Sequence, residues 1–325
     1  MSVIRAVPIG CGHYLPQRIV ENSEFEKTLD TTDEWIKTRT GIERRHFAAD
    51  DEKTSDLAFH AATQALKNAG ITGNDLDAIV LATATPDQTF PSTASRLQAA
   101  LGMNHGFAFD IQAVCAGFIY ALANANALIQ SGQAKTVMVV GAETFSRILD
   151  FTDRATCVLF GDGAGALILQ AQDGTGTSED RGILSTDLNS DGRYNDLLYV
   201  DGGVSSTQTA GVLKMSGREV FKHAVEKLAA SGETALEKAG LTSDEVNWIV
   251  PHQANLRIIA STAKKMGVPM ERVVVTVQDH GNTSAASIPL ALSVASQNGQ
   301  IKQGDLLLLE GIGGGLAWGA AALRW

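Results

Sequence analysis

The sequence predicts an α/β protein in which one unit is duplicated to give two mixed sheets within α-β-α-β-α layers. The first observation is an internal repeat, because the segment starting at Ala65 (ALKNAGIT) matches the segment starting at Ala235 (ALEKAGLT), 170 residues later. Seven of the sixteen positions from 65 to 80 are identical to their partners. The second observation is that short apolar strands alternate with helices in both halves, which is typical of sheets covered on both faces.

The repeat continues with Gly141 and Gly311, also 170 residues apart, before the offset falls to 156 where GAGAL at 163–167 matches GAAAL at 319–323. The 14-residue difference between the two offsets is expected to be a surface loop around residues 143–157. No low-complexity linker divides the chain. We therefore expect two halves, 1–171 and 172–325, packed as one body.

Each half is expected to contain the same elements in the same order. These are a helix, a strand, an Ala-rich helix and a buried strand: 54–68, 78–82, 116–129 and 136–140 in the first half, and 218–238, 248–250, 285–296 and 306–309 in the second. Gly70 and Gly240 follow the first helix of each half, where glycine commonly ends a helix. Residues 1–7 are expected to form a first strand, and the Asp-, Gly- and Ser-rich segment 186–209 a surface excursion.

Composition excludes several classes of protein. With 26 basic and 36 acidic residues the net charge is −10, which disfavours nucleic acid as a partner. No run of 18 apolar residues predicts a membrane span, and the N-terminus does not resemble a signal peptide, so a cytoplasmic protein without a membrane partner is expected. The three cysteines lack the spacing of a zinc site, and an odd number of them indicates free thiols. Neither a metal nor a cofactor is predicted.

Cys115 is the first candidate catalytic residue, in a turn between a predicted strand and an Ala-rich helix. A thiol at the N-terminus of a helix is expected to have a lowered pKa, because the helix dipole favours the thiolate. Taken alone, such a cysteine is more often an ordinary buried residue.

His252 and Asn282 also follow predicted strands, and each alone is typical of a loop or a helix cap. The repeat changes this interpretation, because the 170-residue offset pairs Asn282 with Gln112 and Ala285 with Cys115. A pseudo-twofold axis would bring these turns into one cavity. The amides of Cys115 and Gly314 are expected to form an oxyanion hole there. The GDGAG sequence at 161–165 precedes a predicted strand, so it indicates close strand packing and not a dinucleotide site.

These segments together resemble the 3-oxoacyl-[acyl-carrier-protein] synthase III family over essentially the whole chain. The similar motifs are TDEWIKTRTGI at 32–42, CAGF at 115–118, FGDGAG at 160–165, PHQAN at 251–255 and HGNTS at 280–284. The resemblance implies the thiolase fold and the step that initiates bacterial type II fatty acid synthesis. It also implies a homodimer.

By this resemblance, Cys115 receives the acyl group of an acyl-CoA, which is a substrate and not a cofactor. His252 and Asn282 would then stabilise the enolate formed when malonyl-acyl carrier protein loses carbon dioxide, and that carbanion would attack the acyl-cysteine. The product would be a 3-oxoacyl-carrier protein.

The resemblance assigns further positions to binding. CoA would contact Trp35, Arg39, Arg154, Gly217, Phe221, Ala254 and Asn255, and the acidic carrier protein would contact Lys222, Arg257, Lys264 and Lys265. Phe90 would reach across the dimer to close the acyl pocket, which suggests a short primer such as acetyl. Ile312, where the family often has Phe, would alter the pocket wall, and Cys157, close to Arg154, is a candidate for modification off the reaction pathway.

Other functions remain open. A related polyketide or quinolone-type starter synthase shares Cys, His and Asn, and a non-catalytic acyl-CoA or carrier-protein binding module is a different class. A degradative thiolase is disfavoured, since the second half has no cysteine near its glycine-rich loop. Elongating condensing enzymes typically have two histidines where this chain has His252 and Asn282.

Overall fold

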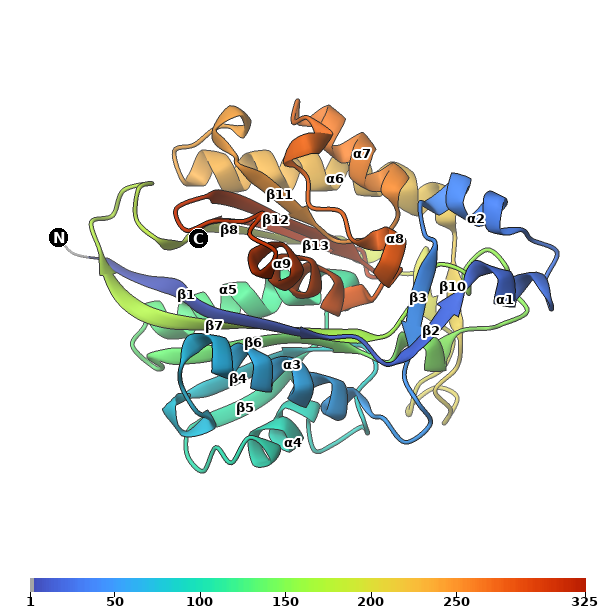
Figure 1. The fold of residues 1–325 in the computed structure, drawn as a ribbon, viewed down its shortest axis with the longest axis horizontal. Coiled ribbons are helices and arrows are strands. Elements are labelled where there is room, and N and C mark those ends of the chain that lie inside the picture. The colour runs from blue at the N-terminus through green and yellow to red at the C-terminus, as the bar shows by residue number, and fades with distance from the viewer. Residues whose placement is uncertain (1–2) are drawn as a thin grey trace.

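Two mixed β-sheets organise residues 3–325, the part of the chain that the computed structural model describes (Figure 1). In spatial order the strands of the first sheet are β1 (Val3–Tyr14), β7 (Gly163–Gly174), β6 (Thr136–Glu143), β4 (Ala78–Ala82) and β5 (Phe107–Ile111). Strand β4 is parallel to β5 and β6, whereas β7 is antiparallel to both of its neighbours. Residues 1 and 2, which the expected first strand includes, lie outside the described residues.

The second sheet repeats this arrangement. Its strands are, in spatial order, β11 (Trp248–Pro251), β12 (Leu306–Gly313), β13 (Ala317–Arg324) and β8 (Gly182–Ser190). Strands β11 and β12 are parallel, and β13 is antiparallel to β12 and β8. Where the first sheet has β5, the second has a parallel bridge from Ile249 to Val273.

The longer helices form three layers around the two sheets (Figure 1). One layer contains α3 (Thr54–Ala69) and α4 (Thr93–Ala100), and the middle layer contains α5 (Gly117–Gln130) and α9 (Ser287–Gln297). The third layer contains α6 (Gly217–Lys238) and α7 (Leu256–Lys265). Apolar residues of α5 and α9 pack between the inner faces of both sheets, α3 and α4 cover the outer face of the first, and α6 and α7 that of the second. The predicted α-β-α-β-α layering is therefore confirmed.

The shorter elements lie near one end of the sheets (Figure 1). They are β2 (Arg18–Glu21), α1 (Asn22–Glu26), α2 (Asp33–Thr40), β3 (Arg44–Phe47), β9 (Leu198–Val200), β10 (Leu213–Met215) and α8 (Val277–His280). Strand β2 pairs with β3, and β9 pairs with β10. No helix between residues 3 and 325 combines the length and the apolar character needed to cross a membrane.

The 170-residue offset is visible in the backbone. Single-turn helices at Val114–Ala116 and Ser284–Ala286 are equivalent, and each begins with a residue of left-handed φ, +48° at Val114 and +49° at Ser284. Strands β6 and β12 also correspond residue by residue, 136–143 with 306–313. The extra residues of the first half lie between β6 and β7, at 144–162, because only residues 314–316 join β12 to β13.

Glycines allow each half to pack against the other. A Cβ atom on Gly141 in β6 would lie 2.2 Å from Ala285 O, and one on its equivalent Gly311 in β12 would lie 3.2 Å from Cys115 O. Similarly, a Cβ on Gly165 would lie 2.5 Å from Leu290 N in α9. The GDGAG segment therefore serves close packing, as its position before a strand indicated.

The expected surface excursion at 186–209 is only partly correct. Residues 186–190 belong to β8, where Asp187 is buried and accepts hydrogen bonds from Ser231 Oγ at 2.8 Å and from Lys238 Nζ at 2.7 Å. These partners allow a polar sequence to form the edge strand of the second sheet. The expected division after residue 171 falls within β7, and we propose the turn between β7 and β8 as the boundary between the halves.

Candidate active site

A cavity of about 540 Å³ contains Cys115, His252 and Asn282 in its wall. Both halves of the chain contribute to it, since Cys115 lies in the turn before α5, His252 follows β11 and Asn282 precedes the turn before α9. The structure therefore brings together the three residues that the sequence singled out. Their neighbours in the wall include eight other predicted site residues: Trp35, Arg39, Gly217, Phe221, Ala254, Asn255, Arg257 and Ile312.

The backbone around Cys115 differs from the expected helix start. Helix α5 begins two residues later, at Gly117, and Cys115 is the middle residue of the single-turn helix Val114–Ala116. The side chain is buried, and this desolvation raises the pKa of the thiol to about 12. The prediction of a lowered pKa is thus wrong for this state of the site, because burial of the thiolate outweighs the helix dipole.

The side-chain oxygen of Asn282, Oδ1, is turned toward the backbone. Its Oδ1 accepts a hydrogen bond from Ser284 N at 2.9 Å, and its main chain bonds with Leu159 O and Gly161 N. The side chain is 6% exposed, in the wall of the cavity. This contact fixes the orientation of the amide, and its Nδ2 group can donate to a bound molecule.

His252 is neutral, because complete burial lowers the pKa of its imidazole to about 3. Its Nδ1 lies 2.6 Å from Ser287 Oγ, and the same oxygen accepts from Gln253 N at 3.2 Å. With that acceptor site used, the Ser287 hydroxyl can donate its proton to Nδ1. A neutral imidazole carries one N–H proton. With Nδ1 acting as an acceptor, this proton sits on Nε2, and His252 is a hydrogen-bond donor at that atom.

The glycine-rich turn after β12 lies against the nucleophile. A Cβ on Gly313 would be 2.5 Å from Cys115 N, and one on Gly314 would be 2.5 Å from Leu198 O. Neither position has space for a side chain. Gly313 is thus the glycine in close contact with the Cys115 amide, and Gly314 is the next residue along the chain.

Trp35 and its arginine neighbours form one part of the cavity mouth. Trp35 lies in α2, whose N-terminus is capped by Thr32 Oγ1 at 3.1 Å from Trp35 N. The guanidinium carbons of Arg39 and Arg154 lie 5.5 Å and 5.2 Å from the indole centroid. Arg154 also bonds to Asp30 and is not part of the cavity wall. An aromatic ring can stack between Trp35 and Arg154 only if this guanidinium moves.

The start of α6 and the start of α7 form another part of the cavity wall. Gly217 and Phe221 come from α6, and Arg257 of α7 lies with its guanidinium carbon 5.5 Å from the Phe221 ring centroid. Asn255 caps α7 by accepting from Ile258 N at 2.9 Å. Leu198 and Met215, in the β9–β10 hairpin, complete this wall.

Three of the four predicted carrier-protein contacts lie outside the cavity. Arg257 is at its mouth, and Lys222 is exposed on the second turn of α6. Lys264 and Lys265 are exposed in the last turn of α7, about 10 Å along the helix axis from Arg257. The four side chains are thus spread over two adjacent helices.

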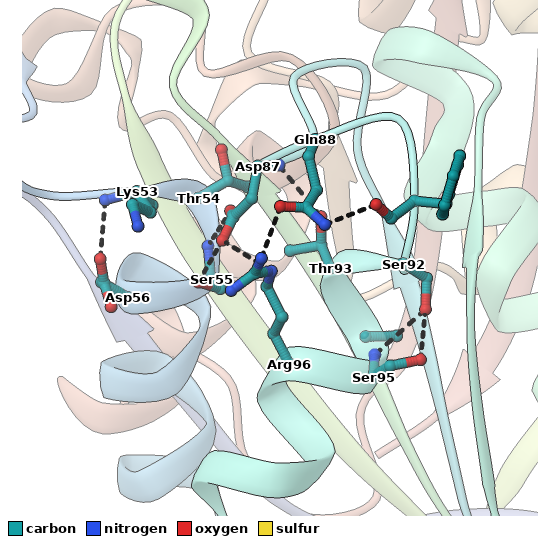
Figure 2. A network of polar contacts seen from close by, with 12 residues as sticks. Lys53, Thr54, Ser55, Asp56, Asp87, Gln88, Ser92, Thr93, Ser95 and Arg96 are labelled. Atoms are coloured by element: carbon teal, nitrogen blue, oxygen red, sulfur yellow. Dashed lines mark hydrogen bonds and ion pairs between the residues drawn. The ribbon is translucent and has the colours of Figure 1, made fainter.

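Phe90 is 79% exposed and does not enter this cavity. The loop that carries it is fixed by polar contacts (Figure 2): Arg96 Nη2 donates to Gln88 Oε1 at 2.6 Å, and Gln88 Nε2 donates to Phe90 O at 2.5 Å. Asp87 accepts from the N and Oγ atoms of Ser55 at 2.9 and 2.6 Å. The loop therefore presents an apolar ring to the outside from a well-anchored backbone.

Two further residues were singled out from the sequence. Ile312 is 5% exposed and contributes to the cavity wall. Cys157 is fully buried, and burial raises the pKa of its thiol to about 11, so the structure does not favour the suggested modification. Within residues 3–325, His, Cys, Asp and Glu side chains form no group of three or more that could hold a metal ion.

Several buried polar residues of the site were not predicted. Ser287 orients His252, Ser284 lies beside Cys115, and Glu143 is completely buried nearby. The repeat contained a signal for the first two, because they occupy the positions equivalent to Gly117 and Val114. No signal in the sequence distinguished Glu143 from an exposed loop residue.

Comparison with known proteins gives one consistent family. Residues 109–192 match the family model of 3-oxoacyl-[acyl-carrier-protein] synthase III, and residues 236–325 match the model of its C-terminal part. Beta-ketoacyl-[acyl-carrier-protein] synthases III from Ruegeria sp. (strain TM1040) and Ruegeria pomeroyi are 73% and 72% identical, with 99% of both chains covered in each case.

Solved structures agree with this result. The 3-oxoacyl-[acyl-carrier-protein] synthase III of Aquifex aeolicus is 47% identical with a TM-score of 0.92, and covers 98% of this chain and 100% of its own. The priming beta-ketosynthase of the R1128 polyketide pathway is 36% identical with a TM-score of 0.91, over 99% and 96% of the two chains.

The fold and the site define a condensing enzyme with the thiolase fold, an acyltransferase. The chain belongs to the 3-oxoacyl-[acyl-carrier-protein] synthase III family, the initiating condensing enzymes of type II fatty acid synthesis.

Proposed function

We propose that this enzyme transfers a short acyl group, such as acetyl, from acyl-CoA to Cys115 and then condenses it with malonyl-acyl carrier protein. The observation that supports this proposal most is the single cavity in which Cys115, His252 and Asn282 meet from the two halves. No cofactor takes part in the scheme, and each step uses groups of the chain and its two substrates.

In the first step, Cys115 Sγ forms a bond to the thioester carbon of acyl-CoA. The amides of Cys115 and Gly314 donate to the developing oxyanion, and the carbon–sulfur bond to CoA then breaks. The thiol proton of Cys115 leaves with the CoA thiol. Trp35, Arg39 and Arg154 would bind the nucleotide end of CoA, and Gly217, Phe221, Ala254 and Asn255 would line the path of its pantetheine arm.

In the second step, His252 Nε2 and Asn282 Nδ2 donate hydrogen bonds to the thioester oxygen of malonyl-carrier protein. These neutral donors stabilise the enolate that forms when the carbon–carboxylate bond breaks and carbon dioxide leaves. The enolate carbon attacks the acyl carbon on Cys115. The Cys115 thiolate departs and is reprotonated, which gives 3-oxoacyl-carrier protein and free enzyme.

Substrate entry and the assembly complete the proposal. An acidic carrier protein would contact Arg257 first, with Lys222, Lys264 and Lys265 around it. A second copy of this chain would cover the exposed Phe90, whose ring would close the partner's acyl pocket and limit the primer to a short chain. The three cysteines are free, which is consistent with a reducing compartment such as the cytoplasm.

The test of the nucleophile is mass spectrometry of the pure protein after incubation with acetyl-CoA. We expect one acetyl group per chain on the native enzyme and none on the Cys115→Ser variant. Cys157→Ser is the matched control and should acylate normally. An adduct that survives Cys115→Ser would contradict the assignment.

A second test separates the two steps. His252→Ala should reduce carbon dioxide release from malonyl-carrier protein by about a hundredfold or more, since it removes an oxyanion donor, while most acylation of Cys115 remains. Equal loss of both reactions would refute this division of roles.

A starter synthase of polyketide or quinolone type is the alternative enzyme, supported by the 36% identical priming ketosynthase. The 73% identity to a beta-ketoacyl-[acyl-carrier-protein] synthase III favours fatty acid synthesis. Side-by-side assays with a panel of acyl-CoA primers and malonyl-carrier protein distinguish the two. Acylation without release of carbon dioxide would support the alternative synthase, or a binding module.

A further inference from the structure

Arg45 is a buried arginine that is not part of the cavity wall. It belongs to β3, its side chain is fully buried, and its guanidinium carbon lies 4.9 Å from the ring centroid of Phe25. Burial lowers the pKa of this guanidinium to about 10, so it remains charged at neutral pH. A buried charge costs free energy unless hydrogen bonds compensate it, and the partners of Arg45 therefore indicate its role.

The guanidinium of Arg45 donates hydrogen bonds to three uncharged oxygens. Its Nη1 donates to Val20 O at 3.1 Å and to Asn22 Oδ1 at 2.8 Å, and its Nη2 donates to Val158 O at 2.6 Å. Val158 belongs to the cavity wall. Asn22 is itself fixed, because its Nδ2 donates to Ile42 O at 2.8 Å. Arg45 therefore ties the wall segment at 158–161 to β2 and α1.

The main chain of Asn282 is held by the same wall segment. Asn282 N donates to Leu159 O at 2.8 Å, and Asn282 O accepts from Gly161 N at 3.0 Å. A Cβ on Gly161 would lie 2.9 Å from Arg45 Cβ, and so would a Cβ on Gly281. The side chain of Arg45 thus packs directly against both segments. The position of Asn282 is coupled to the guanidinium through residues 158–161.

The other two residues of the site are held by different contacts. His252 N donates to Glu310 O at 2.7 Å, and its imidazole is oriented by Ser287. The amide of Cys115 lies against Gly313. A change at Arg45 should therefore displace the amide of Asn282 selectively. Displacement of a donor by about 1 Å can slow a chemical step by about a hundredfold.

We propose that Arg45 is a positioning residue for Asn282 in the decarboxylation step. Its guanidinium fixes residues 158–161, and this segment holds Asn282 where Nδ2 reaches the thioester oxygen of malonyl-carrier protein. The inference rests on the proposed function, which assigns Asn282 to the enolate, and it adds a residue that touches neither substrate. Lysine cannot replace Arg45, because a single ammonium group lacks the planar fork that reaches separate oxygens.

The test measures two rates in each variant: single-turnover acetylation of Cys115 by acetyl-CoA, and carbon dioxide release from malonyl-carrier protein by enzyme already acetylated. Arg45→Lys should slow carbon dioxide release about tenfold or more, because a displaced donor stabilises the enolate less. Acetylation should change less than about twofold, since the contacts that hold Cys115 do not include Arg45. Arg324→Lys is the matched control, because Arg324 also donates to main-chain oxygens, those of Ser178 and Gly304. It should leave both rates unchanged.

A double-mutant cycle distinguishes positioning of Asn282 from a general loss of structure. Asn282→Ala alone should slow carbon dioxide release about a hundredfold, since it removes an oxyanion donor. Adding Arg45→Lys to Asn282→Ala should then slow it by less than about twofold, because the donor that Arg45 positions is already absent. Losses that multiply in the double variant would overturn the inference. A native rate of carbon dioxide release in Arg45→Lys, or an equal loss of acetylation, would also overturn it.

A second variant covers the case in which Arg45→Lys does not fold. Asn22→Ala removes one acceptor of the guanidinium and leaves the charge in place. It should slow carbon dioxide release more than acetylation, and equal effects on the two rates would overturn the inference. Failure of the native enzyme to form an acetyl adduct, or native carbon dioxide release by Asn282→Ala, would instead reject the proposed function, and the inference with it.

Discussion

At the scale of single residues, burial controls the ionisation of the site more than charge pairing does. His252 and Cys115 are both kept neutral by loss of hydration, and no ion pair with a described residue offsets this effect. A neutral imidazole suits a donor to a thioester oxygen. The same environment makes a free thiolate costly, so the proton of Cys115 needs a defined path.

Glu310 gives a prediction about pH and stability. It is fully buried in β12, its Oε2 has no partner among the described residues, and burial raises its pKa to about 8 from 4.5. Because the folded-state pKa lies above the unfolded value, the protonated carboxyl contributes stability that is complete below about pH 4 and is lost as the pH rises through 8.

Glu310→Gln keeps the shape and cannot ionise, so its free energy of unfolding should fall less between pH 5 and pH 9 than that of the native protein. Urea unfolding at several pH values measures this difference, with Glu271→Gln, at an exposed position, as the control. Parallel pH profiles for Glu310→Gln and the native enzyme would show that Glu310 does not titrate in this range.

At the scale of elements, the close contact of β7 with α9 fixes the distance between a sheet and the central helices. Gly165→Ala would place a methyl group 2.5 Å from Leu290 N, and a backbone atom cannot rotate away. We expect a loss of about 1–3 kcal/mol or more in the free energy of unfolding. Gly192→Ala, where a Cβ meets no atom within 4 Å, should change stability little. Equal effects in urea unfolding would contradict this account of the packing.

Most elements could be predicted because their patterns are local. The first helix was expected at 54–68 and ends at Ala69, where Gly70 adopts a left-handed φ of +69°. Strand β12 extends past the expected 309 to Gly313, because glycines weaken an apolar pattern without ending the strand. Strand β8 was missed because its buried Asp187 is paired with Ser231 and Lys238 of α6, which are distant in sequence.

The candidate site, like the fold, could be predicted in part. Cys115, His252 and Asn282 could be related through the repeat, and the cavity contains all three. The raised pKa of the Cys115 thiol and the buried Glu143 could not be predicted, because both depend on burial between elements that are distant in sequence. Phe90 could be placed on a loop, but the sequence did not show how exposed its ring would be.

At the scale of the whole molecule, the exposed edge of the first sheet gives a prediction about assembly. Strand β5 is an edge strand, Phe107 on it is 38% exposed, and Phe90 is 79% exposed. Unprotected apolar edges favour pairing with another chain. Light scattering should therefore give twice the chain mass of 34.3 kDa.

The Phe107→Lys variant should shift this equilibrium toward the single chain, because the added charge opposes pairing at the edge. Tyr199→Lys, which changes an exposed aromatic residue in β9, should leave the mass unchanged. A native enzyme that runs as a single chain at micromolar concentration would contradict the proposed dimer.

The unequal connections between matching strands have one further consequence. Residues 144–162 join β6 to β7, whereas three residues join the equivalent strands β12 and β13. The longer connection supplies four residues of the cavity wall: Ala155, Val158, Leu159 and Phe160. Loops of this kind tolerate changes in length better than sheets do. We therefore expect new substrate preferences to evolve most readily through changes in residues 144–162, the connection in which the two halves of the chain differ in length.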